Sequence, residues 1–281
     1  MLEYPSIFRY SLTVWRAVKI LKCGQSAGKA HKGTLRDYMP DPVTLSSVTG
    51  EDIVRSAWRH AGVPTLKYTS MNTKEISEKK KNLQLSKRQR ELIVGLLLGD
   101  GHLETQNNGR TYRLKVEHGS AQREYLEWLA KEFQEWLVSG WYEKRKGEKL
   151  VYGFTTVSHP AFRFYGAQFY QNGKKRIPPL IKKLMTSLSL AIWFLDDGSA
   201  KSSRHRSLVI HSLGYNRKDL ELVQEALRRF GIESALHKQR NDSLRIYVSY
   251  EGARIIADFV QPILDDVPLF AYKVENIKPK K

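Results

Sequence analysis

Two stretches of the chain are mostly apolar, and both end in the same way. The first covers residues 92–98 and the second residues 180–195, and each is followed by an Asp-Gly pair whose acid is Asp100 or Asp197. A helix that is apolar on all sides has to be buried. The pattern therefore predicts two core helices that each end at an Asp-Gly pair.

The elements that follow each apolar stretch have the same order. After the first, alternating and amphipathic patterns predict a strand, a helix, a hairpin and a helix over residues 112–116, 122–137, 141–157 and 160–172. After the second, they predict the same elements over residues 207–213, 217–230, 233–250 and 251–264. A repeat of roughly 100 residues is too long for a solenoid module. The sequence therefore predicts two similar halves related by a pseudo-two-fold axis.

The predicted fold class is α+β, with two pseudo-symmetric halves that meet at a central two-helix interface. Ser86 lies three residues before Gln89, which fits a capping box at the start of the first buried helix. We therefore expect a first half over residues 86–178 and a second half over residues 179–281.

Residues 1–85 form a basic N-terminal extension of unknown role. Its first 36 residues carry seven Lys or Arg and a single acid, Glu3. A basic, acid-poor N-terminus is typical of an organelle transit peptide. A basic arm that touches DNA, or a segment read through from an upstream coding region, explains the same composition, so the three interpretations stay open.

The charge balance indicates a polyanionic partner. Among the 281 residues, 47 Lys and Arg oppose 29 Asp and Glu, which gives a formal net charge of +18. The basic residues are spread along the chain rather than gathered on one amphipathic helix, so a membrane surface is the weaker explanation. We expect no transmembrane helix, since no uncharged apolar stretch is long enough. The single Cys23 excludes an internal disulfide framework and a CxxC zinc site.

Four basic clusters fall on strand-rich segments of the two halves. A β-ribbon fits the major groove of DNA, where basic and amide side chains read base edges. Clusters at equivalent places in both halves therefore predict two sheets that form one DNA-binding surface. The residues predicted to bind DNA are Arg110, Arg113, Lys115, Lys144, Arg145, Lys146, Lys149, Lys201, Arg204, Arg206, Lys238, Arg240 and Arg245.

Asp100 and Asp197 stand at matching ends of the two buried helices. The negative end of a helix dipole repels a carboxylate. A carboxylate at this position therefore indicates a place where a cation can bind. Gly95 would let the other helix approach closely, and helices packed side by side would bring the two carboxylates together. Paired carboxylates suit Mg²⁺ or Mn²⁺, and two metal ions beside a phosphodiester activate water and stabilise the leaving oxygen. Either Asp-Gly pair taken alone is equally explained as a C-terminal turn.

Residues 93–101, IVGLLLGDG, and 190–198, LAIWFLDDG, resemble two copies of the LAGLIDADG motif. The segments GLLLGDGHLE, NGRTYRLKVE, GKKRIPP, SLAIWFLDDG and FAYK are similar to the monomeric, two-motif, intron-encoded homing endonucleases, especially the omega-intron type. The resemblance covers residues 86–275 and leaves the first 80 unmatched. It implies two αββαββα halves that form a β-saddle around the two-helix interface. It also implies a metal-dependent endonuclease that makes a double-strand break at a long, nearly asymmetric DNA target.

The resemblance also implies roles for single residues. In the family, the final acid of each motif binds the catalytic divalent metal ions, which corresponds to Asp100 and Asp197. The backbone carbonyl before each acid is a further metal ligand, which corresponds to Gly99 and Asp196. Asp196 stands where the motif has a small residue, so its side chain has no counterpart role in the motif.

A lysine late in each half lies near the scissile phosphates in this family. The matching residues are Lys175 in GKKRIPP, with Lys174 as a one-residue alternative, and Lys273 in FAYK. From the sequence without the resemblance, each of these lysines is explained as a solvated charge.

The leading hypothesis is therefore a monomeric DNA endonuclease that uses Mg²⁺ or Mn²⁺ and binds double-stranded DNA. A second hypothesis is an intron maturase that binds intron RNA with the same fold, and a third is a DNA-binding regulator without catalysis. Both intact Asp-Gly ends favour the nuclease. We expect an intracellular protein of a mitochondrion, a chloroplast or a bacterial cytoplasm, and no membrane partner.

Overall fold

The computed structural model describes residues 74–202, 205–212, 214–239 and 242–277. All of these residues belong to one compact unit. The basic segment predicted as a transit peptide or DNA-contacting arm lies outside the described residues. No helix in the described ranges is long and apolar enough to cross a membrane.

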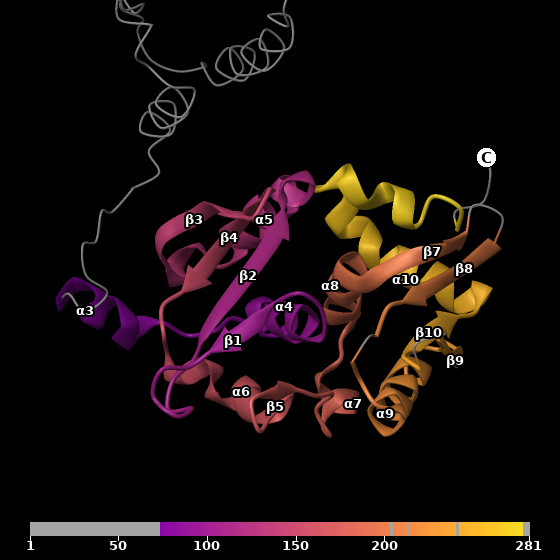
Figure 1. Cartoon of the computed structure of the whole chain (residues 1–281), viewed down its shortest axis with the longest axis horizontal. Helices are drawn as coiled ribbons and strands as arrows, with labels where there is room; N and C mark the ends of the chain where they lie inside the picture. The colour runs from indigo at the N-terminus through magenta and orange to yellow at the C-terminus, as the bar shows by residue number, and fades with distance from the viewer. Residues whose placement is uncertain (1–73, 203–204, 213, 240–241, 278–281) are drawn as a thin grey trace, which may run out of the picture. The chain divides into compact units, whose positions relative to one another are not determined.

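The first half contains three helices and four strands in the order αββαββα (Figure 1). A short helix, α3 (Lys74–Asn82), precedes it. The elements of the first half are α4 (Lys87–Leu98), β1 (His102–Glu104), β2 (Arg113–Gly119), α5 (Arg123–Glu132), β3 (Leu137–Lys146), β4 (Lys149–Thr156) and α6 (Arg163–Phe169).

The second half repeats this order. A small hairpin, β5 (Tyr170–Gln171) with β6 (Lys174–Lys175), and a one-turn helix, α7 (Ile181–Leu184), connect the halves. The elements are then α8 (Ser187–Asp197), β7 (Gly198–Ser202), β8 (His205–Ile210), α9 (Arg217–Arg228), β9 (Ser234–Lys238), β10 (Leu244–Val248) and α10 (Tyr250–Leu264), followed by the 3-10 helix η6 (Pro268–Lys273).

Each half contains one antiparallel sheet of four strands, and the two sheets have the same topology. The first sheet has the strand order β1-β2-β4-β3, and the second has the order β7-β8-β10-β9. In both, the strand that follows the buried helix lies at one edge and the first strand of the hairpin at the other. The identical order confirms the predicted α+β class and the two pseudo-symmetric halves.

The sequence prediction was wrong about where two of the helices begin or end. The second buried helix begins at Ser187 rather than near residue 180, because Thr186 and Ser189 form a capping box that starts a new helix. The amphipathic helix ends at Glu132 rather than at residue 137. Its last carbonyl, of Glu132, accepts a hydrogen bond from Gln89 Nε2 at 2.8 Å, so a side chain of α4 terminates it. The short edge strands β1 and β7 gave no pattern that predicts them.

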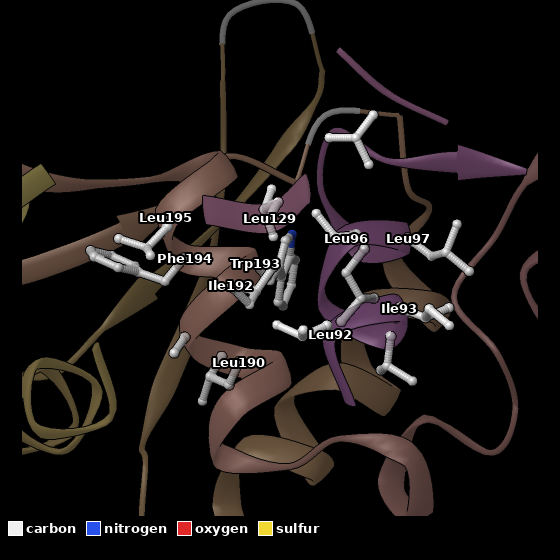
Figure 2. Close-up of a cluster of buried hydrophobic side chains, with 14 of the residues drawn as sticks. Leu92, Ile93, Leu96, Leu97, Leu129, Leu190, Ile192, Trp193, Phe194 and Leu195 are labelled. Atoms are coloured by element: carbon white, nitrogen blue, oxygen red, sulfur yellow. The ribbon is translucent and has the colours of Figure 1, made fainter. Parts of the chain in front are cut away.

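The two buried helices pack directly against each other and form the centre of the core. Figure 2 shows Leu92 and Leu96 of α4 facing Ile192 and Trp193 of α8, and all four side chains are fully buried. A glycine sets how close the helices come. A Cβ atom placed on Gly95 would lie 2.6 Å from the backbone oxygen of Ser189 and 2.7 Å from Ile192 Cβ. The backbone of α4 therefore contacts α8 directly at this point.

Replacing Gly95 by alanine should destabilise the protein, because the added methyl meets backbone that cannot rotate away. Overpacking of this kind costs about 1–3 kcal/mol, which exceeds the roughly 1 kcal/mol that alanine gains over glycine in a helix. Urea unfolding measures the change in the free energy of unfolding.

Gly119→Ala is the matched control, since a Cβ there meets no atom within 4 Å. Equal free energies of unfolding for the wild type and Gly95→Ala would contradict the close packing of the helices.

Candidate active site

The two motif acids lie at the C-terminal ends of the packed helices. Asp100 follows Gly99, the C-cap of α4, whose N–H donates to the carbonyl of Gly95 at 3.1 Å. Asp197 is the last residue of α8. The side chain of Asp100 is 48% exposed, and that of Asp197 is partly buried. Both carboxylates therefore stand at negative helix ends, where a cation would offset the repulsion.

The side chain of Asp196 crosses the helix interface and holds the other half's acid in place. Its Oδ2 accepts the backbone N–H of Asp100 at 3.1 Å, and its Oδ1 accepts the hydroxyl of Tyr125 at 3.1 Å. Gly99 leaves the room for it, since a Cβ there would lie 2.6 Å from Asp196 Cβ. Burial, together with the charge of Asp100, raises the pKa of Asp196 well above its usual range. Asp196 positions the backbone of Asp100.

Two lysines from opposite halves donate to backbone carbonyls near the C-terminal ends of the two helices. Lys175 Nζ donates to the carbonyl of Gly99 at 2.7 Å, and Lys273 Nζ donates to the carbonyl of Leu195 at 2.6 Å. Burial lowers the pKa of both ammonium groups, and the three nearby aspartates oppose that shift. Lys174, the one-residue alternative, is exposed. Lys175 therefore contacts the carbonyl directly before Asp100, whereas Lys273 contacts the carbonyl two residues before Asp197.

Asp197 differs from Asp100 in its environment. Its Oδ2 accepts Trp193 Nε1 at 3.1 Å, and its backbone oxygen accepts the N–H of His211 at 2.9 Å. Burial and the charge of Asp100 raise the pKa of Asp197 to about 6. Two carboxylates from different halves therefore repel each other through the site.

His118 adds an imidazole next to Asp100. Its Nδ1 lies 2.9 Å from Gln122 Oε1 and 3.6 Å from Asp100 Oδ2, and the side chain is 1% exposed. Burial lowers the pKa of the ring despite the nearby Asp100. One ligand atom each from Asp100, His118 and Asp196 lie within 4.8 Å of one another.

The donor set suits a hard divalent cation. The carboxylates of Asp100 and Asp197 supply oxygen donors, and burial with the charge of Asp100 disfavours the ionised form of Asp197, which a bound cation would stabilise. Both oxygens of Asp196 already accept hydrogen bonds within the protein. The residues present therefore fit Mg²⁺ or Mn²⁺ held mainly by Asp100 and Asp197.

The first sheet gathers most of its predicted basic residues on one face. Side chains alternate along a strand, and the cross-strand pairs Lys115 with Thr155 and Lys146 with Lys149 fix which residues share a face. Arg145 projects to the opposite face, and Arg110 lies in the loop between β1 and β2. The basic face, so called below, carries Arg113, Lys115, Lys144, Lys146 and Lys149.

The predicted basic residues of the second sheet are more dispersed. Lys201 Nζ lies 5.6 Å from the ring centre of Tyr247, which is two residues from Arg245 along β10. Lys238 pairs with Asp242 at 2.7 Å, and the guanidinium of Arg206 lies 5.8 Å from the Tyr250 ring. Arg204 and Arg240 lie outside the described residues.

Sequence reasoning assigned no role to three neighbours of the motif acids. These are Tyr125, which binds Asp196, His118, which approaches Asp100, and Trp193, which binds Asp197. The segment HGSAQREYL contains the first two and matches HSLGYNRKDLEL of the second half. The two segments both begin with a histidine, His118 in the first half and His211 in the second. This repeated histidine was the sequence signal that could have pointed to His118.

A comparison with protein families decides which family has this arrangement. A model described as the LAGLIDADG DNA endonuclease family matches residues 90–256, more than half of the chain. The chain belongs to the LAGLIDADG DNA endonuclease family. The matched segment includes both motif acids and both sheets.

Known LAGLIDADG proteins are similar to most of the chain beyond the N-terminal extension. A probable intron-encoded endonuclease 1 of Wickerhamomyces canadensis is 29% identical over 215 residues, which cover 72% of this chain and 91% of the relative. The structure of the homing endonuclease I-WcaI bound to its DNA recognition sequence is 28% identical with a TM-score of 0.67, covering 74% of this chain and 96% of that one. The cytochrome b mRNA maturase bI2 of Debaryomyces hansenii is 27% identical over 206 residues, covering 69% of this chain and 76% of the relative.

Asp197→Asn should change how the stability of the metal-free protein depends on pH. A carboxyl whose pKa is raised from 3.8 to about 6 on folding stabilises the protein below about pH 4 and loses that contribution as the pH rises through 6. The loss is on the order of 1–3 kcal/mol. We expect Asp197→Asn to be more stable than the wild type at pH 7.5 by about this amount, measured by urea unfolding with a chelator.

Asp258→Asn, an exposed change on α10, serves as the control. If the free energy of unfolding fell by the same amount between pH 4 and pH 7.5 in the wild type and in Asp197→Asn, the pKa of Asp197 would not be raised.

Proposed function

We propose that this chain is a homing endonuclease that makes a double-strand break at a long, nearly asymmetric DNA target. The observation that carries the proposal is the meeting of two acids and two lysines at one interface between the halves. Asp100 and Asp197 lie at the C-terminal ends of the packed helices, and Lys175 and Lys273 donate to backbone carbonyls near the same ends. A site with one set of groups from each half suits cleavage of two strands.

The division of the chain follows from the same symmetry. Residues 86–178 and 179–281 would each act on one strand, and both halves in one chain make a monomer sufficient. The basic face of the first sheet and the more dispersed basic residues of the second would form a saddle over the major groove. Residues 1–85 remain an extension of unknown role, and an organelle or bacterial compartment stays a prediction.

Catalysis would combine a divalent metal with the positioning of charge by this chain. Asp100 and Asp197, with the carbonyls of Gly99 and Asp196, would hold Mg²⁺ or Mn²⁺. When bound, the metal supplies a Lewis acid that activates water and neutralises charge on the phosphate. Lys175 and Lys273 would offset the negative charge that develops on the scissile phosphates.

The remaining groups of the site keep it in one geometry. Asp196 fixes the backbone of Asp100 through its N–H, and Trp193 fixes the carboxylate of Asp197. Because both acids are held by bonds within the protein, little reorganisation is needed when DNA binds. I-WcaI, which is similar to this chain, binds its DNA recognition sequence, and this supports DNA as the partner of this chain.

An intron maturase is the second candidate, and the likeness to a cytochrome b mRNA maturase favours keeping it. Such a protein would use the basic surface for RNA and would need neither motif acid. The buried lysines and the cross-interface bond of Asp196 favour the nuclease, since a protein that only binds RNA gains nothing from charges held at this cost.

Asp100→Asn and Asp197→Asn should each abolish double-strand cleavage while leaving DNA binding within about threefold of the wild type. Each variant keeps the size of the side chain and removes the charge that holds the metal, and loss of such a group typically costs a factor of at least 10²–10³ in rate. Cleavage of a plasmid that carries the intronless insertion site, with Mg²⁺, measures the effect, and a gel-shift assay with Ca²⁺ measures binding.

Asp258→Asn controls for the loss of one negative charge and should cleave normally. Full double-strand cleavage by either motif variant would sink the assignment. Splicing of the cognate intron by a variant that no longer cuts DNA would show that the maturase activity exists beside, and independent of, the nuclease.

A further inference from the structure

The basic face of the first sheet carries two carboxylates among its cations. Glu104 of β1 pairs with Arg113 at 2.7 Å and with Lys115 at 3.1 Å. Glu117 of β2 lies further along the same face, two residues after Lys115. The described strands β7 to β10 of the second sheet contain no Asp or Glu. The two halves therefore differ in how their positive charge is held.

Glu117 is the meeting point of three lysines from two strands. Its carboxylate pairs with Lys146 at 2.7 Å, with Lys115 at 3.5 Å and with Lys144. The hydroxyl of Tyr142 donates to the same group at 2.8 Å. The Glu117 side chain is 12% exposed. Burial opposes ionisation, yet the lysines and the tyrosine hold the pKa of Glu117 well below its usual range.

The sheet leaves space for this cluster at one glycine. Gly153 of β4 lies directly between Glu117 and Tyr142, and it pairs with both. A Cβ on Gly153 would lie 2.9 Å from Glu117 Cγ and 2.8 Å from Tyr142 Cζ. The two side chains therefore lie flat over the backbone of β4, and the lysines close over them.

A carboxylate on a DNA-binding face needs a physical reason, because it repels phosphates and lowers the affinity for any DNA. A lysine is a flexible point charge that loses side-chain entropy when it is fixed. Three lysines held by one anion lose that freedom before DNA arrives, and their ammonium groups gather over the middle of the sheet. Phosphate contacts tolerate mobile lysines, whereas contacts to base edges require defined positions.

We propose that Glu117 is a positioning residue that determines the sequence specificity of the first half. It holds Lys115, Lys144 and Lys146 over the centre of the basic face, where their ammonium groups read acceptors of base edges in the major groove. The inference rests on the proposed DNA-binding function. In the second sheet Lys201 lies over the Tyr247 ring and Lys238 pairs singly with Asp242, so no described carboxylate there gathers several lysines. That sheet contacts the phosphate backbone.

Glu117→Gln tests the proposal, with Glu143→Gln as the matched control. Glu143 lies next to Tyr142 on β3 but on the opposite face, so both variants remove one negative charge and only one releases the lysines. Binding to the target and to unrelated DNA is measured by fluorescence anisotropy between 50 and roughly 300 mM salt. Base preference is read from a library of targets randomised over the first half-site.

We expect Glu117→Gln to bind unrelated DNA several-fold more tightly and to lose about tenfold or more of its preference for the target. Its plot of log affinity for unrelated DNA against log salt should be steeper than that of Glu143→Gln by about one phosphate contact. The loss of base preference should spread over several positions of the half-site. Tyr142→Phe keeps every charge, so it should reduce the preference less and leave the salt slope unchanged.

Equal salt slopes and equal base preferences for Glu117→Gln and Glu143→Gln would overturn the proposal. A loss confined to one base pair would also overturn it, because Glu117 would then read that base directly. Unfolding of Glu117→Gln would leave the Tyr142→Phe result to decide. A wild type that does not prefer the target at all would refute the proposed function itself, and the two failures are therefore distinguishable.

Discussion

The close approach of α4 and α8 is the constraint on which the rest of the structure depends. Gly95 brings the backbone of one helix against Ser189 and Ile192 of the other, and Gly99 leaves the room that Asp196 fills. At both places the small residue belongs to the first half and the large one to the second. The interface therefore fits one half to the other and not to a copy of itself, although the halves share one topology.

That approach produces the electrostatics of the site. Two helix ends, each with its negative dipole, meet together with three aspartates, and this would be unfavourable without compensation. Lys175 and Lys273 supply part of it through the carbonyls that they contact near the helix ends. Burial and the charge of Asp100 still raise the pKa of Asp197. A divalent cation bound here would relieve the repulsion between these negative groups, so the site favours cation binding. The same arrangement explains why it belongs at the interface rather than within one half.

The sequence predicted what depends on local pattern and on repetition. The apolar helices, the hairpins and the Asp-Gly ends could be predicted, because buried helices and strands leave a periodic pattern and turns have characteristic residues. Other features could not be predicted in this way. The new helix start at Thr186 and the end of α5, where Gln89 binds the carbonyl of Glu132, depend on individual hydrogen bonds. The strands β1 and β7 contain only three and five residues, too few for a clear alternation. The roles of Asp196 and Glu117 were equally hidden. Each acts on residues that only the folded chain brings near.

The central claim is that the packed helices bring one acid from each half to a shared metal site. A crystal structure of the chain with its target DNA and Mn²⁺ tests this directly through the anomalous scattering of the metal. The account predicts anomalous peaks next to the carboxylates of both Asp100 and Asp197, beside the scissile phosphates. Peaks that touch only one of these acids, or only DNA, would contradict it.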